Sequence, residues 1–186
     1  MEATELLSNE HKDILLALDI MNRICQVLTK DPANVAPGIA EDLAKLHEFL
    51  IVFADKSHHG KEENVLFKAM NEAGLPMDEG PLGVMLYEHD EGRSYIRGMG
   101  EGLSQMKSQP KTACEQFVQN ARSYSQLLSQ HIDKEDHILY PMANNCLNPA
   151  DDCVMLDNFA SIEKEHLGAK KQVFKQMLAD LKQKYL

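Results

Sequence analysis

HHGKEENVLF (residues 58–67) and HIDKEDHILY (residues 131–140) are two versions of one charged motif that leads into an apolar run. When the two are aligned on their shared Lys-Glu pair, His58 falls on His131, and the apolar triplets that follow also coincide. The chain therefore carries the pattern His-x-x-x-Glu-x-x-[Val/Ile]-Leu-[Phe/Tyr] twice. A surface helix would scatter such residues, so the repetition indicates two related segments with a shared task.

The segments around these motifs have helical periodicity. Apolar residues recur at helical spacing almost throughout, and Pro, Gly, Asn and Asp occupy the breaks. This pattern predicts an all-α fold, an up-down-up-down four-helix bundle with an additional C-terminal helix. Thr4 is a suitable N-cap for the first helix, and Gly60 marks a local irregularity in the second. The expected helices cover about 4–30, 37–72, the segment from 82 to about 107, the segment from 113 to about 145, and about 155–184.

None of the breaks is long enough or polar enough to be a linker between two domains. We therefore expect one domain over residues 1–186, with the bundle at about 3–145 and the extra helix at about 155–184. In such a bundle the second and fourth helices, which carry the two motifs, are diagonal partners. A shared interior site would lie on that diagonal.

Composition excludes several classes of protein. A formal charge of −10 argues against a nucleic-acid partner, because phosphate neutralisation needs clustered Lys and Arg. The four cysteines form no Cys-x-x-Cys pair, and no Gly-rich phosphate loop is present. No apolar stretch approaches the roughly 18 residues of a membrane span, and acidic residues dilute the N-terminal segment. We expect a cytoplasmic protein without a membrane partner, and the sequence leaves the oligomeric state open, a homodimer included.

The candidate site consists of histidines and glutamates on apolar faces. His58 with Glu62, and His131 with Glu135, are spaced i, i+4 and so lie on one face of a helix. His11 and His89 lie on the apolar stripes of the first and third helices. Each bundle helix thus offers one inward imidazole. An unpaired carboxylate on such a face would cost several kcal/mol, so its burial must be compensated.

Four imidazoles and two carboxylates suit a pair of transition-metal ions with bridging carboxylates. The alternative is structural: each histidine alone is more often a hydrogen-bonded core residue. A buried network of salt bridges with Lys or Arg is the main competitor, and Arg93, one turn after His89, is placed to join it. Four such histidines on four helices, together with the duplicated motif, favour the metal.

These residues resemble the hemerythrin-like, or HHE cation-binding, family. The similarity covers about residues 3–145, and HHGKEENVLF, YEHDEGR and HIDKEDHILYPMA are similar to segments of its single-domain prokaryotic members. The resemblance implies a four-helix bundle with a non-haem di-iron centre whose two ions are oxo- or hydroxo-bridged. It also implies a division of the ligands: His11 and His58 on one iron, His89 and His131 on the other, and Glu62 and Glu135 bridging both.

One position departs from the oxygen carriers of that family. They have a further histidine four residues after the first on the third helix, where this chain has Arg93. The iron held by His89 is therefore expected to be one ligand short, which argues against reversible oxygen storage and favours turnover at an open position. The pattern is closer to the family's di-iron proteins linked to iron-sulfur cluster repair, and to its iron-sensing domains.

Several other residues are weaker candidates. His59 and Glu63 also form an i, i+4 pair, but the second motif has Ile132 at the position of His59, which favours His58 and Glu62. The remaining candidates have second-rank roles. They are His47 as an alternative or supporting ligand, Glu163, Glu165 or His166 as a lid over the site, Tyr87 and Tyr124 as hydrogen-bond donors to a bound oxygen species, and His137 as a solvent-facing or capping residue.

The predicted function is a di-iron protein that binds, senses or reacts with dioxygen, peroxide or nitric oxide, or handles iron. Zinc accepts the same ligands, so the ligands alone do not decide the metal. The alternatives are a metal-responsive regulatory or interaction module, a zinc-binding bundle and a purely structural bundle. The sequence leaves open whether the protein is an enzyme.

Overall fold

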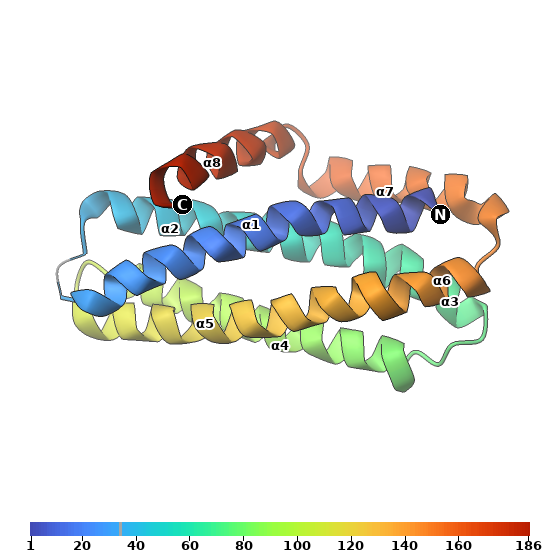
Figure 1. The fold of residues 1–186 in the computed structure, drawn as a ribbon, viewed down its shortest axis with the longest axis horizontal. Helices are drawn as coiled ribbons and strands as arrows, with labels where there is room; N and C mark the ends of the chain where they lie inside the picture. The colour runs from blue at the N-terminus through green and yellow to red at the C-terminus, as the bar shows by residue number, and fades with distance from the viewer. Residues whose placement is uncertain (34) are drawn as a thin grey trace.

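The computed structural model describes residues 1–33 and 35–186, and these are almost entirely helical, with no strand among them (Figure 1). No helix in the described ranges is both long enough and apolar enough to cross a membrane. The helices are α1 (Glu2–Lys30), α2 (Pro37–Phe49), α3 (Phe67–Glu72), α4 (Gly80–Gln105), α5 (Pro110–Lys134), α6 (Tyr140–Cys146), α7 (Asp152–His166) and α8 (Lys170–Tyr185).

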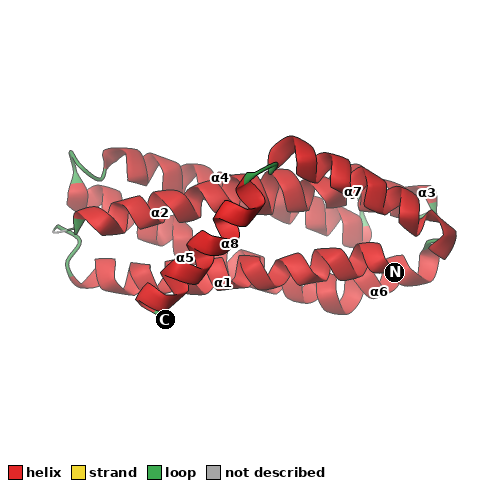
Figure 2. Ribbon diagram, turned by 90° about the horizontal axis from the view of Figure 1, so that it is seen from above, coloured by secondary structure: helices red, strands yellow, loops and turns green. Residues whose placement is uncertain are grey.

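Four long helical rods form the bundle. Helix α2 continues without a break into α3, and α5 continues into α6. Helices α1 and α4 each pack against both α2 and α5, so α2 and α5 are diagonal partners, as the sequence predicts. Helices α7 and α8 then run back along α1 and the α2–α3 rod, outside the bundle (Figures 1 and 2). The predicted all-α bundle with an additional C-terminal helical segment is confirmed.

That C-terminal segment forms two helices, whereas the sequence predicted one. Gly168, at φ +48°, adopts a left-handed conformation that favours glycine and ends α7. Its N–H and that of Leu167 both donate to the carbonyl of Glu163, at 3.2 and 2.8 Å. The break redirects the chain, so that α8 packs on α1 and α2 while α7 covers the segment that contains the first motif.

Helix α1 begins two residues before the predicted N-cap, Thr4. The free N–H groups of Glu2 and Ala3 donate to the carboxylate of Asp152, at 2.7 and 3.0 Å. A carboxylate at a helix N-terminus satisfies these groups and interacts favourably with the helix dipole. The Thr4 hydroxyl instead donates to the carbonyl of Met1 at 2.9 Å. A cap supplied by a residue 150 positions away in sequence replaces the local one.

Both motifs contain π-helical turns. The α2–α3 rod is π-helical over Leu50–His59 and again over Glu62–Leu66, on either side of Gly60, so the irregularity expected there is confirmed. The α5–α6 rod is π-helical over Glu135–Leu139. Such turns interrupt α-helices most often at functional sites.

Most of the buried ionisable residues form a layer between two apolar clusters. Along α1, Leu7 belongs to one cluster and Ile14 to the other, and His11 lies between them. The same order holds on the α5–α6 rod, where His131 and Glu135 lie between Leu128 and Leu139. The bundle therefore places these histidines and glutamates in a single cross-section.

Asp42 of α2 fastens the end of α8. Its Oδ2 accepts from Lys184 Nζ at 2.6 Å and from the Tyr185 hydroxyl at 2.8 Å. Burial alone would raise the pKa of Asp42, but hydrogen bonds from Lys184, Tyr185 and Lys45 hold it below its usual range. The stabilisation is therefore complete above the ordinary aspartate pKa of about 4, and it is lost as the pH falls through the lowered value.

We predict that Asp42→Asn releases α8 at neutral pH, as acid does for the native chain. Hydrogen exchange of amides 170–185 should become faster, while amides of the bundle keep their protection. Asp180→Asn, which removes an exposed carboxylate of α8, is the control. Equal exchange of α8 in both variants would contradict the assignment.

Candidate metal centre

The six residues singled out by the sequence come together in the polar layer. Each of the four bundle rods contributes one imidazole, and the two motif-bearing rods add a carboxylate each. All six side chains are at most 1% exposed. They are His11, His58, Glu62, His89, His131 and Glu135.

The histidines form two pairs whose Nε2 atoms converge. His11 Nε2 lies 3.1 Å from His58 Nε2, and His89 Nε2 lies 3.0 Å from His131 Nε2. Glu135 spans the two pairs, because its Oε2 lies 3.3 Å from His11 Nε2 and its Oε1 lies 3.0 Å from His131 Nε2. One carboxylate thus offers one oxygen to each pair.

Glu62 also lies between the pairs. Its Oε2 is 3.8 Å from His58 Nε2 and 3.5 Å from His89 Nε2. Its Oε1 accepts a hydrogen bond of 2.7 Å from the hydroxyl of Tyr140. Tyr140 therefore occupies one oxygen of Glu62 and leaves the other directed between the imidazoles.

A second ring of carboxylates fixes the tautomer of the four imidazoles. A carboxylate oxygen lies against each Nδ1, so each imidazole donates its Nδ1–H outward and directs Nε2 to the interior, where the neutral ring presents a lone pair. This arrangement is typical of metal-bound histidine. The pairs are His11 with Asp136 at 3.0 Å, His58 with Glu10 at 2.9 Å, His89 with Glu63 at 2.7 Å and His131 with Glu88 at 2.8 Å.

The lysine of each motif supports this second ring. Lys61 donates to Glu10, the carboxylate behind His58, and Lys134 donates to Glu88, the carboxylate behind His131. The acidic residue that follows the glutamate of each motif accepts a hydrogen bond from a histidine of a neighbouring rod. Glu63 accepts from His89, and Asp136 accepts from His11. The two motifs therefore match in their contacts, shell by shell.

The protein groups alone leave acceptors without donors at the centre. Glu62 Oε2 and both carboxylate oxygens of Glu135 are buried without a hydrogen-bond partner. Among the described residues, no Lys or Arg forms an ion pair with either carboxylate. Carboxylate oxygens and imidazole Nε2 atoms that converge in this way fit cations, since a cluster of carboxylates without Lys or Arg partners is otherwise costly to bury.

Protonation among these groups follows the same logic. Burial and the neighbouring Glu135 raise the pKa of Glu62 well above its usual range. Burial opposes ionisation of Glu135 too, but His131 and His11 hold its pKa well below the usual range. Burial lowers the pKa of His58 to about 4, whereas Glu135 and Glu88 outweigh burial and raise that of His131 to about 9. The layer is a coupled set in which protons and cations compete for the same atoms.

The tyrosine at the site is not one that the sequence suggested. Tyr87 is 69% exposed, and Tyr124 is buried with its hydroxyl unpaired, so neither contacts the six residues through a hydrogen bond. Tyr140 does: besides Glu62, its hydroxyl lies 3.3 Å from His11 Nε2. The first motif has Phe67 at the matching position, and a Phe/Tyr alternation is weak evidence for a polar contact.

Of the second-rank histidines, one lies inside the buried layer and two lie outside it. His59 lies in the buried layer, stacked on His89. His47 donates from Nε2 to the Ile96 carbonyl at 2.8 Å, outside the layer. His137 is solvent-facing, as predicted.

The predicted lid residues do not reach the layer. Glu163 contacts Lys61 and Lys171, Glu165 is exposed, and His166 is half-buried. The Arg93 network proposed as a competitor exists, but it contacts Asp55, Glu63 and Asp90 around the layer rather than the inner carboxylates.

The family model described as hemerythrin HHE cation binding domain matches residues 2–143. The chain belongs to this family. The HHE region coincides with the four bundle rods and contains all six converging residues, and α7 and α8 lie beyond it. The description of the family names cation binding, and the chemistry of the converging acceptors is suited to it.

Curated relatives of this HHE protein include enterobacterial sequences. The iron-sulfur cluster repair protein YtfE of Salmonella schwarzengrund (strain CVM19633) is 28% identical over 138 residues, which cover 73% of this chain and 60% of that protein. The same identity and coverage apply to YtfE of Salmonella newport (strain SL254) and Salmonella heidelberg (strain SL476). The chain spans about three fifths of the length of these relatives.

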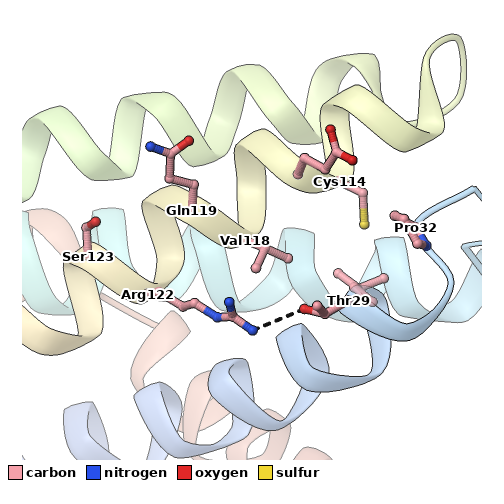
Figure 3. Close-up of a pocket in the computed structure, with 9 residues that line it drawn as sticks. Thr29, Pro32, Cys114, Val118, Gln119, Arg122 and Ser123 are labelled. Carbon is pink, nitrogen blue, oxygen red and sulfur yellow. Dashed lines mark hydrogen bonds between the residues drawn. The ribbon is translucent and has the colours of Figure 1, made fainter.

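A hollow of about 460 Å³ near the C-terminal end of α1 is separate from the centre of this HHE protein (Figure 3). Arg122 reaches across it and donates to the Thr29 hydroxyl at 3.1 Å. Eighteen residues of α1 separate Thr29 from His11, roughly 27 Å at the helical rise. The hollow therefore has no contact with the polar layer.

We predict that Lys61→Met destabilises the protein far more than Lys134→Met. Lys61 is fully buried and pairs with Glu10 and Glu163, so its loss leaves a buried carboxylate uncompensated, at about 3–5 kcal/mol. Lys134 is 34% exposed, and an ion pair with that access to water contributes about 1 kcal/mol or less. Urea denaturation of both variants measures the difference. Similar losses would contradict the matched but unequal roles of the two lysines.

Proposed function

We propose that this HHE protein is a non-haem di-iron protein that binds or reacts with a small molecule, namely nitric oxide, dioxygen or peroxide, in the protection or repair of iron-sulfur clusters. The proposal rests on two pairs of imidazoles whose Nε2 atoms converge, with Glu135 between the two pairs. Two such donor groups, linked by carboxylates, suit two ions rather than one.

The ligand assignment follows the two pairs. His11 and His58 would hold one ion, His89 and His131 the other, and Glu62 and Glu135 would bridge them. The distances from each bridging carboxylate to a histidine of both pairs support this division. Iron is proposed on the strength of the family and of relatives named for iron-sulfur clusters. Zinc accepts the same donors, and metal analysis separates the two.

Iron at this centre would supply exchange between ferrous and ferric states and a coordination position for a small molecule. The protein's own residues do the rest. The outer carboxylates hold the four imidazoles in one tautomer, and the flanking apolar clusters exclude bulk water. The Tyr140 hydroxyl holds a proton beside Glu62 and His11, where it is placed to donate to a bound anion.

A surface hollow beside α1 and α6 lies next to the centre. Its volume is about 350 Å³, and its lining includes Asp136 and Tyr140, which both contact His11. We accordingly propose a small-molecule partner, without nucleic acid or membrane, and a cytoplasmic location.

The role in iron-sulfur repair rests on the similarity to YtfE over 138 residues. That similarity covers 60% of each of those proteins, so their printed function is carried to this chain as a proposal. The chain differs from the oxygen carriers on α4, where Arg93 stands in place of their extra histidine.

We predict two irons per chain after expression in iron-rich medium, with diferric absorption in the near ultraviolet. Glu62→Ala and Glu135→Ala should each fall below one iron per chain while the helical circular dichroism is retained, because each removes a bridge. Glu165→Ala, on the exposed face of α7, is the control. A wild-type protein that binds no iron, or binds zinc in its place, would refute the di-iron centre.

The repair role has its own test. The iron-loaded protein should restore activity to a [4Fe–4S] dehydratase damaged by nitric oxide at a rate at least several times that of the Glu135→Ala variant. The assay contains a thiol reductant and equal iron in both arms. Equal recovery with free ferrous iron alone would show that the protein takes no part in repair, while leaving its metal content unaffected.

A further inference from the structure

His59 lies in the buried polar layer, although the second motif has an apolar residue at the matching position. Its ring stacks on that of His89, with centroids 3.9 Å apart and planes inclined by 15°, and lies 5.8 Å from the ring of His131. Potential ligand atoms of His59, Glu62, His89 and His131 all lie within 4.8 Å of one another. The matching position on the other rod, Ile132, belongs to the apolar core.

A carboxylate lies behind His59, as one does behind the other four imidazoles. Asp55, one turn earlier on the same rod, places its Oδ1 3.6 Å from His59 Nδ1. This contact is longer than a hydrogen bond, so stacking on His89 contributes to holding the ring. Nδ1 therefore lies on the side of Asp55. In an imidazole supported in this way, Nε2 is the nitrogen that remains for a metal.

Arg93 joins the supports of the two stacked imidazoles. Its Nε donates to Asp55 Oδ1 at 2.8 Å, and its Nη2 donates to Glu63 Oε1 at 2.6 Å. Glu63 Oε1 is also the acceptor for His89 Nδ1, at 2.7 Å. One guanidinium therefore holds the carboxylates behind both His59 and His89.

The backbone explains how two consecutive histidines reach one layer. Successive side chains of an α-helix are separated by about 100°, which would direct only one of the two inward. Here the turn that ends at His59 is π-helical, with the wider i→i+5 spacing. As a result His58 and His59 are both buried, at 1% and 3% exposure, and each faces a different histidine pair.

We propose that His59 is a fifth imidazole ligand of the centre, on the side of His89 and His131, and that Arg93 is a positioning residue that acts through Asp55 and Glu63. The assignment rests on the proposed metal-binding function and deepens it. The iron that the sequence left one ligand short thereby receives its donor from the α2–α3 rod instead of from α4. On α4, the position at which the oxygen carriers have that histidine is occupied by Arg93, which supports His59.

The decisive comparison uses anaerobic titration of the metal-free wild-type, His59→Ala and His47→Gln proteins with ferrous iron. The wild type and the His47→Gln control, whose histidine lies outside the layer, should bind two irons. His59→Ala should bind the second iron at least tenfold more weakly, and added imidazole, which fits the space left by the ring, should restore it. Thermal unfolding of the metal-free proteins verifies that each variant folds.

Arg93→Met tests the positioning role by a spectroscopic readout. The second iron should bind about 10- to 100-fold more weakly, and the Mössbauer spectrum should change for one iron site and stay the same for the other. Arg93→Lys should recover part of the affinity, because it retains the charge without the fork that spans two carboxylates.

Two results would overturn the assignment, and they differ in what else they refute. Two tightly bound irons in His59→Ala, with unchanged affinity and no response to imidazole, would show that His59 is no ligand while leaving the di-iron centre intact. A wild-type protein without iron would refute the proposed function and this assignment together.

Discussion

The contact on which the rest of the centre depends is the hydrogen bond from each buried Nδ1–H to a carboxylate. Without it, an imidazole in this apolar cross-section would lose solvation and have no fixed tautomer. With it, Nε2 of His11, His58, His89 and His131 must face the interior. The convergence of acceptors is thus a consequence of where the outer carboxylates lie, and these in turn need their own cationic partners.

The duplicated motif supplies an imidazole, an inner carboxylate, an outer carboxylate and a supporting lysine from one short stretch on each of two diagonal rods. His, Lys, Glu and the acid that follows have the same contacts in both copies, so a pseudo-twofold relation extends from the inner carboxylates to the supporting lysines. Besides Tyr140, whose counterpart is Phe67, the relation fails at two places. Helix α7 covers Lys61 and gives it a second acceptor in Glu163, while Lys134 remains partly exposed. His59 faces the layer where the other rod has Ile132.

Sequence spacing was sufficient for the rods and for the six inner residues, because i, i+4 periodicity and repetition are local properties. It was insufficient wherever a contact joins distant residues. The cap of α1 comes from Asp152, and the hydroxyl beside Glu62 comes from Tyr140, whose counterpart in the repeat is a phenylalanine. The repeat even argued against His59, since a π-helical turn, which no simple periodicity reports, is what directs two consecutive side chains inward. Gly168 is a comparable case: one left-handed residue divided an otherwise continuous helical pattern.

The order of the shells explains how so many ionisable groups are accommodated in a small bundle. The inner imidazoles and carboxylates are at most 1% exposed, the carboxylates behind the imidazoles are 10–25% exposed, and Lys134 and Arg93 are 34% exposed. Charge is therefore balanced step by step toward solvent, where the dielectric constant is higher and a cation costs less to hold. Lys61 differs from these two residues because it is fully buried, under α7. Its charge is nevertheless balanced, by two carboxylates instead of one. Among the residues that the structure describes, no Lys or Arg pairs with the two inner carboxylates, and that is the position in which the two iron ions are proposed.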